Sequence, residues 1–157
     1  MVEPVDAWQV RLAERQDRER ELLAEWWEAL RERDDAAEAR DRLIAGRDRA
    51  VSRILGGMSA KQQTWVQRHL TYATRPRDAA GRQRVLTWIG NQERVRACQA
   101  DWAARIEPAE RRLHNAEDRL GDLAGAALDM WGHKRCEEMT GVPWQRVAAW
   151  ARHRRSA

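Results

Sequence analysis

Apolar residues in the second half of the chain recur at spacings that alternate between three and four residues. Twelve of the fourteen positions in this series are apolar: Val85, Trp88, Gln92, Val95, Gln99, Trp102, Ile106, Ala109, Leu113, Ala116, Leu120, Leu123, Ala127 and Met130. Such alternation places the side chains on one face of a helix, here called the heptad seam. The pattern predicts helices over 79–105 and 108–131. They are either separate or joined at a kink, because Pro108 lacks an amide hydrogen and Gly90-Asn91 can bend or break a helix.

The first fifty residues carry a weaker form of the same pattern. Leu12, Leu23, Trp26, Leu30 and Ile44 follow it, but polar residues interrupt the series. Because neither Pro nor Gly occurs between Pro4 and Gly46, and Gly56-Gly57 can end a helix, the sequence predicts a helix from about 6 to 55. Consecutive residues of a helix point about 100° apart. Only one of Trp26 and Trp27 can therefore lie on the apolar face of the helix. The other ring predicts a further partner helix.

Turn and capping residues predict shorter elements after this helix. Ser59 and Gln62 have the spacing of a capping box and predict the start of a second helix. The segment 74–78 reads as a loop in which Asp78 can cap the following helix. Gly132 should close the long helical stretch. A helix at about 133–140, a turn at Gly141 and a helix from Pro143 to about Arg154 should follow.

Together these elements predict an all-α protein, a long antiparallel helical hairpin or coiled-coil bundle with a small C-terminal helical unit. Residues 1–131 would form the long-helix domain and residues 132–157 the small unit. The heptad seam can be closed within the chain or between two copies. We expect a homodimer in which the coiled coil is the dimerisation element.

Charge is distributed unevenly along the chain. Residues 1–50 hold 10 basic and 14 acidic residues, whereas residues 51–100, here called the basic middle, hold 9 basic and 2 acidic residues. The basic middle includes Arg68, His69, Arg75, Arg77, Arg82, Arg84, Arg94 and Arg96. It can bind a phosphate backbone. Alternatively, it can pair with the acidic arm 14–41 within one molecule or a dimer.

Other features narrow the classes of function. Cys98 and Cys136 form neither a CxxC nor a disulfide framework, which favours a reducing cytoplasm. No run of about 18 apolar residues predicts a membrane span, and the first residues lack the features of a signal peptide. His133 and Cys136 lie three residues apart, but no second pair completes a metal site. We therefore expect no enzyme activity, no metal and no cofactor.

The segment R-C-E-E-M-T-G-V-P-W-Q-R-V-A-A-W, residues 135–150, resembles the helix-turn-helix of many bacterial DNA-binding proteins. Gly141 matches the turn glycine, and Cys136, Met139, Val142, Val147 and Trp150 match the buried apolar positions. The sequence departs from the family at Glu137, where a small residue is usual, and at Pro143, which replaces the capping Ser or Thr. The alternative interpretation is a helical hairpin that closes the end of the bundle, with Trp144 and Trp150 as plugs.

The resemblance implies a recognition helix that begins at Pro143. Trp144, Gln145 and Arg146 would then reach base edges, and Arg152, Arg154 and Arg155 would reach phosphates. The predicted function is non-enzymatic DNA binding by a dimer. The alternative is a helical scaffold or adaptor that binds a protein partner along its heptad seam.

Overall fold

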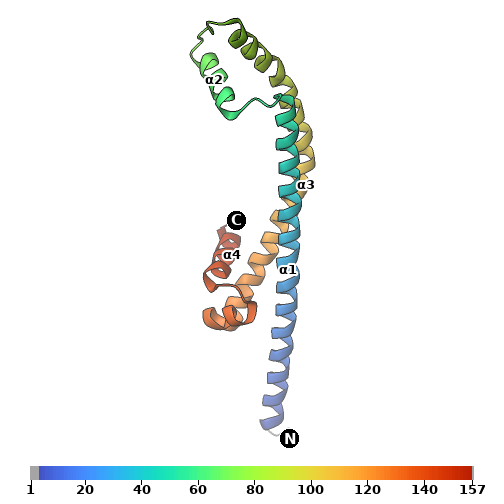
Figure 1. The fold of residues 1–157 in the computed structure, drawn as a ribbon. Helices are drawn as coiled ribbons and strands as arrows, with labels where there is room; N and C mark the ends of the chain where they lie inside the picture. Colours follow the sequence, from blue (N-terminus) through green and yellow to red (C-terminus); the bar gives the residue numbers. More distant parts are fainter. Residues whose placement is uncertain (1–3, 157) are drawn as a thin grey trace. The chain divides into compact units, whose positions relative to one another are not determined.

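The computed structural model describes residues 4–156, and side chains from Asp6 onwards. Four helices make up the described chain: α1 (Pro4–Ile54), α2 (Ala60–Thr71), α3 (Ala79–Thr140) and α4 (Trp144–Ser156), as Figure 1 shows. No strand occurs among these residues, so the predicted all-α class is confirmed. None of the described helices is long and apolar enough to cross a membrane.

The ends of α1 and α2 follow from the local sequence. After α1, Gly56 and Gly57 adopt positive φ angles of 64° and 75°, a conformation that glycine tolerates and a continuing helix does not allow. At the start of α2, Ser59 Oγ accepts a hydrogen bond from Gln62 N (3.2 Å), and Gln62 Oε1 accepts one from Ser59 N (2.9 Å). The predicted capping box is therefore present.

From Ala79 to Trp131, α3 is one continuous helix, where the sequence left open two helices or one. It continues through Gly90-Asn91 and has Pro108 inside it. The missing amide of Pro108 costs hydrogen bonding, but Ile106 and Leu113 on either side are buried, and this burial favours a continuous helix. The helical φ/ψ pattern is broken at Gly132, where φ is 71°.

The described chain divides into two compact units, and each long helix contributes to both. Unit 1 contains Met1–Glu38 and Glu110–Ala157, and unit 2 contains Ala39–Ala109. The domain boundary that the sequence predicted between residues 131 and 132 lies inside unit 1, at the Gly132 kink. The division into a long-helix domain and a small C-terminal unit stays a prediction.

Unit 1 has a core to which α1, α3 and α4 all contribute. Its buried members are Leu22, Trp26, Ala29, Leu120, Leu123, Ala124, Ala127, Trp131, Cys136, Val147 and Ala151. The rings of Trp26 and Trp150 lie 5.8 Å apart. The last 25 residues are therefore held to the long helices by apolar burial, the main source of stability in a helical bundle.

Unit 2 contains α2 together with the adjoining parts of α1 and α3. The Trp65 ring of α2 lies under the Arg84 guanidinium of α3 at 5.5 Å, and Val66 is fully buried. Where α1 packs on α3 in this unit, a Cβ placed on Gly46 of α1 would lie 2.7 Å from the Trp102 ring of α3. A glycine at this position lets the tryptophan ring approach the backbone of α1.

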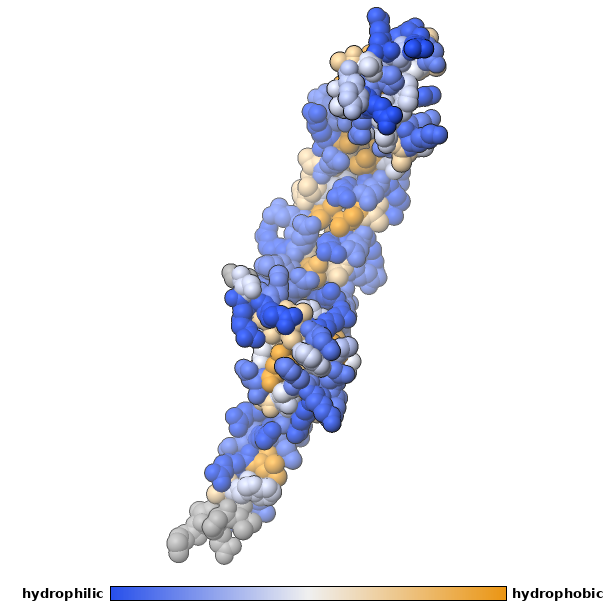
Figure 2. Space-filling model, turned by 90° about the vertical axis from the view of Figure 1, so that its left-hand side faces the viewer, coloured by the Kyte–Doolittle hydropathy of each residue, from blue (hydrophilic) through white to orange (hydrophobic). Residues whose placement is uncertain are grey.

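The heptad seam is closed within the chain. Every one of its fourteen positions is buried or half-buried except Gln99. In unit 1 the seam residues Leu120 and Leu123 share a core with Leu22 of α1, and in unit 2 Trp102 packs over Gly46. The surface in Figure 2 is accordingly mainly hydrophilic, with apolar side chains in separate small patches.

Candidate nucleic-acid interface at the C-terminal helix pair

Two glycines define a helix pair at the end of unit 1. Gly132 breaks α3, residues 133–140 continue as helix, and Gly141 turns the chain with φ 66°. The amides of Arg146 and Val147 donate to Pro143 O at 2.9 and 3.3 Å, which begins the hydrogen bonding of α4. The predicted helix, turn and second helix are therefore all present.

The apolar positions of the predicted motif meet inside this pair. Cys136 and Val147 are completely buried, and Met139, Val142 and Trp150 pack at the edge of the same core. Burial raises the pKa of the Cys136 thiol. At neutral pH this group is therefore a neutral packing residue and not a reactive thiolate.

Thr140 is a structural residue of the turn that sequence reasoning did not single out. Its side chain is fully buried, its Oγ1 donates to Cys136 O (2.7 Å), and the same oxygen accepts from Val142 N (3.3 Å). A hydroxyl two residues before a turn amide is a known capping signal. The sequence therefore held a clue to this role.

Glu137 supplies the cap that Pro143 cannot provide. Its Oε2 accepts a hydrogen bond from Trp144 N at 3.1 Å. An acidic oxygen at a helix N-terminus satisfies an otherwise free amide and interacts favourably with the helix dipole. The two departures from the helix-turn-helix pattern, Glu137 and Pro143, therefore compensate each other.

Helix α4 has an inner and an outer face. Val147, Ala148 and Ala151 are buried, whereas Gln145, Arg146, Ala149 and Arg152 are exposed. At 100° per residue, Gln145, Ala149 and Arg152 lie within one narrow sector opposite Val147. The outer face thus combines an amide, a small residue and a guanidinium.

Three of the six predicted contact residues, Trp144, Arg146 and Arg154, have other side-chain contacts within the protein. Trp144 is half-buried and its ring stacks on that of His133, at 4.4 Å and with 5° between the planes. Arg154 forms ion pairs with Asp118 (3.3 Å) and Asp122 (3.0 Å), and the hydrogen bond to Asp122 raises the pKa of its guanidinium. Arg154 therefore ties α4 to α3.

The remaining cations of α4 have no acidic partner. Arg146 lies over the Trp150 ring at 5.0 Å, and within the described chain neither Arg146, Arg152 nor Arg155 forms an ion pair. Helix α4 contains no Asp or Glu. Its free positive charge is available to an anionic ligand.

Several acids of α1 are paired with arginines of α3 in the same unit. Arg119 bonds Glu28 (3.0 Å) and Glu32 (3.1 Å), and the hydrogen bond to Glu28 is the main reason that the pKa of Arg119 is raised. Arg135 bonds Glu19 at 3.2 Å. These pairs partly neutralise the acidic arm.

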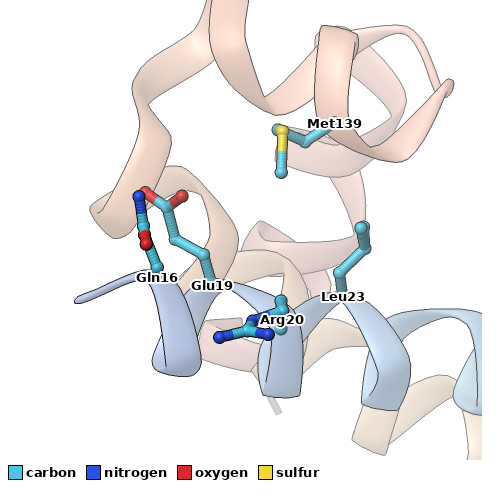
Figure 3. Close-up of a pocket in the computed structure, with 5 residues that line it drawn as sticks. All are labelled: Gln16, Glu19, Arg20, Leu23 and Met139. Carbon is cyan, nitrogen blue, oxygen red and sulfur yellow. The ribbon is translucent and has the colours of Figure 1, made fainter. Parts of the chain in front are cut away.

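A hollow of about 250 Å³ lies between α1 and Met139 (Figure 3). Gln16, Glu19, Arg20 and Leu23 of α1 form its other wall. Its one carboxylate, that of Glu19, is held by Arg15 (3.3 Å) and Arg135. This arrangement serves packing of the helix pair and offers no free acid or base.

Metal ligands do not gather in the described part of the chain. No group of three or more His, Cys, Asp or Glu side chains there could hold a metal ion. His133 stacks on Trp144, and Cys136 points into the core.

The arginines of the basic middle lie in unit 2. Among the described residues, Arg68, Arg75, Arg77, Arg82, Arg84, Arg94 and Arg96 form no ion pair. Pairing of this region with the acidic arm stays a prediction, because most of that arm belongs to unit 1.

Comparison of the chain with family models, with curated proteins and with solved structures finds no match. The helix pair is therefore interpreted from its own geometry and chemistry.

Proposed function

We propose that this protein is a non-enzymatic DNA-binding protein that uses α4 as the recognition helix of a helix-turn-helix. The observation that carries the proposal is the two-sided character of α4. Val147 and Ala151 fix its inner face in the core, while Gln145, Arg146 and Arg152 project outwards without acidic partners. A helix that is anchored along one side and basic along the other suits the major groove.

In this proposal the outer residues have distinct roles. Gln145 and Arg146, in the first turn of α4, contact base edges, where Gln pairs with adenine and Arg with guanine. Ala149 allows close approach because it has no long side chain. Arg152 and Arg155 contact phosphates, which set the position of the helix on the duplex. Arg154 and Trp144 hold α4 in place through Asp122 and His133.

Pairing of two copies is the second part of the proposal, because two recognition helices can read two half-sites of a palindrome. The heptad seam is covered within the chain, so pairing needs another apolar surface. Trp8 and Leu12 of α1 are 58% and 39% exposed. We assign the pairing of two copies to this stretch of α1.

We also propose that the protein is located in the cytoplasm.

The adaptor alternative has less support. It requires the heptad seam to be open to a partner protein, yet the seam positions other than Gln99 are covered by the chain's own helices. The outer face of α4 favours DNA instead.

The proposal is tested by fluorescence anisotropy with a labelled 30-base-pair duplex at several salt concentrations. We expect binding that weakens steeply with salt, since each phosphate contact contributes a slope of about −0.9 to log K against log [salt]. Arg152→Ala should lower affinity and reduce this slope by about 0.9. Arg146→Ala should lower affinity by about 1–3 kcal/mol on a preferred sequence.

Arg31→Ala is the matched control, because Arg31 is an exposed arginine of the same unit without an ion pair in the described chain, and it lies outside the stretch assigned to pairing. It removes the same charge as Arg152→Ala and should change binding little. Absence of binding at about 50 mM salt, where electrostatic binding is strong, would refute the proposal. Equal losses in all three variants would also count against it, because they would indicate a nonspecific charge effect.

A further inference from the structure

A hollow of about 280 Å³ lies in unit 2, where the loop after α2 meets the first turns of α3. Pro76, Val85 and Leu86 form its apolar wall, and Arg75 and Arg82 line its rim. Figure 1 shows this loop, between green and olive, joining α2 to α3. The hollow takes no part in the proposed contact between α4 and DNA.

The loop that forms the hollow is held in a defined shape. The Arg82 guanidinium donates to Pro76 O (3.4 Å) and Arg77 O (3.1 Å). Asp78 Oδ1 accepts from Gly81 N at 2.6 Å, and Pro76 is buried. A ligand would therefore meet a preformed surface and would not have to order the loop on binding.

Large apolar side chains are exposed beside the hollow. Leu86 is 62% and Ile89 50% exposed, and they lie three residues apart on one side of α3. Leu70 and Tyr72, directly before the loop, are 43% and 72% exposed. Exposed apolar groups next to a concave surface are typical of a site that another molecule covers.

The surroundings of the hollow are strongly basic. Between residues 59 and 96 the acids are Asp78 and Glu93, and Asp78 is engaged by the Gly81 amide. The cations are Lys61, Arg68, Arg75, Arg77, Arg82, Arg84, Arg94 and Arg96. None of these arginines has an ion pair within the described chain, and Arg75 and Arg82 line the hollow itself, so its rim is complementary to an acidic ligand.

We infer that this hollow binds an acidic segment of a partner protein. One apolar side chain of the segment fills the space against Pro76, Val85 and Leu86, and carboxylates of the segment pair with Arg75 and its neighbour Arg77. A phosphate backbone would leave Leu86 and Ile89 without a role. A lipid surface is flat and would not fill the hollow. An acidic peptide with an apolar anchor uses both the charge and the shape.

The test selects binders from a phage-displayed library of random 16-residue peptides on the immobilised full-length protein. Affinities of the selected peptides are then measured by fluorescence anisotropy. We expect the selected peptides to be rich in Asp and Glu, to share one large apolar residue, and to bind more weakly at high salt. Leu86→Asp and Arg75→Ala should each weaken their binding at least tenfold.

Thr87→Asp and Arg94→Ala are the matched controls. Thr87 is the exposed neighbour of Leu86 and points about 100° away on α3. Arg94 is an exposed arginine of the same unit that does not line the hollow. Both controls should retain peptide binding within about twofold. Because all four positions are exposed or at the rim, the variants should keep the helical circular dichroism of the parent.

Three results would overturn the inference. The first is a selection that yields neutral or basic peptides, and the second is binding that Leu86→Asp leaves unchanged. The third is binding of vesicles of equal phosphatidylserine and phosphatidylcholine, or of duplex DNA, that depends on Leu86 and Arg75 in place of the peptides. The DNA-binding test with Arg146→Ala is independent of the peptide-binding test, because Arg146 lies in unit 1 and the hollow lies in unit 2.

Discussion

At the scale of single residues, Glu137 gains its role from a contact that the linear pattern does not reveal. In the sequence it stands where a helix-turn-helix usually has a small residue. In the structure its carboxylate accepts the Trp144 amide, seven residues further along the chain. The side chain is exposed, so it does not disturb the contact between the two helices.

Replacing Glu137 by Ala should lower the free energy of unfolding by about 1 kcal/mol, the usual cost of losing a helix N-terminal cap. Glu137→Gln should lose less, because its amide oxygen can still accept the bond. Guanidinium denaturation followed by circular dichroism measures the difference. Glu138→Ala is the control, since Glu138 is an exposed neighbour whose side chain forms no hydrogen bond in the described chain. Equal losses at both positions would contradict the capping role.

The adjacent Trp26 and Trp27 make a second comparison between residues. Trp26 is completely buried, and Trp27 is 45% exposed. Trp26→Ala should therefore lower the free energy of unfolding by about 3–5 kcal/mol, as for other large buried side chains. Trp27→Ala should cost less than about 1 kcal/mol. Thermal denaturation of the two variants checks the orientation of α1, and the reverse order would contradict it.

The sequence predicted that only one of these two rings enters the seam, because helical geometry alone requires it. It did not say which one. The choice depends on Trp150, Leu120 and Ala124, which lie around Trp26 but are more than ninety residues away in the chain. Trp27 is 45% exposed, and the further partner helix that the pair suggested stays a prediction.

At the scale of elements, glycines inside the long helices differ in what surrounds them. A Cβ on Gly46 would lie 2.7 Å from the Trp102 ring, whereas a Cβ on Gly90 would meet nothing within 4 Å. Both lie in helix interiors, where alanine is favoured over glycine by about 1 kcal/mol. The sequence shows glycine at both positions, and the packing around each one decides whether alanine would stabilise or destabilise the protein there.

Gly90→Ala should raise the free energy of unfolding by about 0.5–1 kcal/mol. Gly46→Ala should lower it, because the displacement of a packed ring costs about 1–3 kcal/mol and outweighs the helical gain. Differential scanning calorimetry of both variants gives the two signs. Stabilisation by Gly46→Ala would show that the Trp102 ring does not lie against α1.

Prediction of the elements themselves succeeded where the signal was local. The capping box at Ser59, the stop at Gly56-Gly57 and the turn at Gly141 each depend on residues within a few positions. Continuity through Pro108 could not be decided locally. The loss of one amide competes there with the burial of Ile106 and Leu113, and burial is a property of the tertiary structure.

At the scale of the whole molecule, closure of the heptad seam within one chain changes what a dimer could use. The seam contributes its apolar residues to the cores of the two units. The described residues of α1 from Asp6 to Arg18 are exposed, and Trp8 and Leu12 are among them.

Sedimentation velocity over a range of concentrations tests the proposed pairing. We expect a dimer at micromolar concentration that Leu12→Asp converts to a monomer, because a charge on an apolar contact opposes association. Glu14→Gln, at an exposed position two residues away, should leave the dimer intact. A dimer that survives Leu12→Asp would place the pairing elsewhere. If the wild-type protein were a monomer, the proposed pairing would be wrong. The proposed contact of α4 with DNA would then still be tested by the anisotropy experiment.

The sequence by itself determined the helical class, the long seam, the turns and the apolar positions of the C-terminal pair. These features follow from periodicity and from local backbone preferences, which act over a few residues. The tertiary structure decided that the seam is closed by α1, that Trp26 and not Trp27 is buried, that Glu137 caps α4, and that Arg154 is paired while Arg146 and Arg152 are free. The Glu137 cap joins residues seven positions apart across a turn, and the other outcomes depend on contacts between residues that are distant in the chain. Periodicity carries no information about either kind of contact.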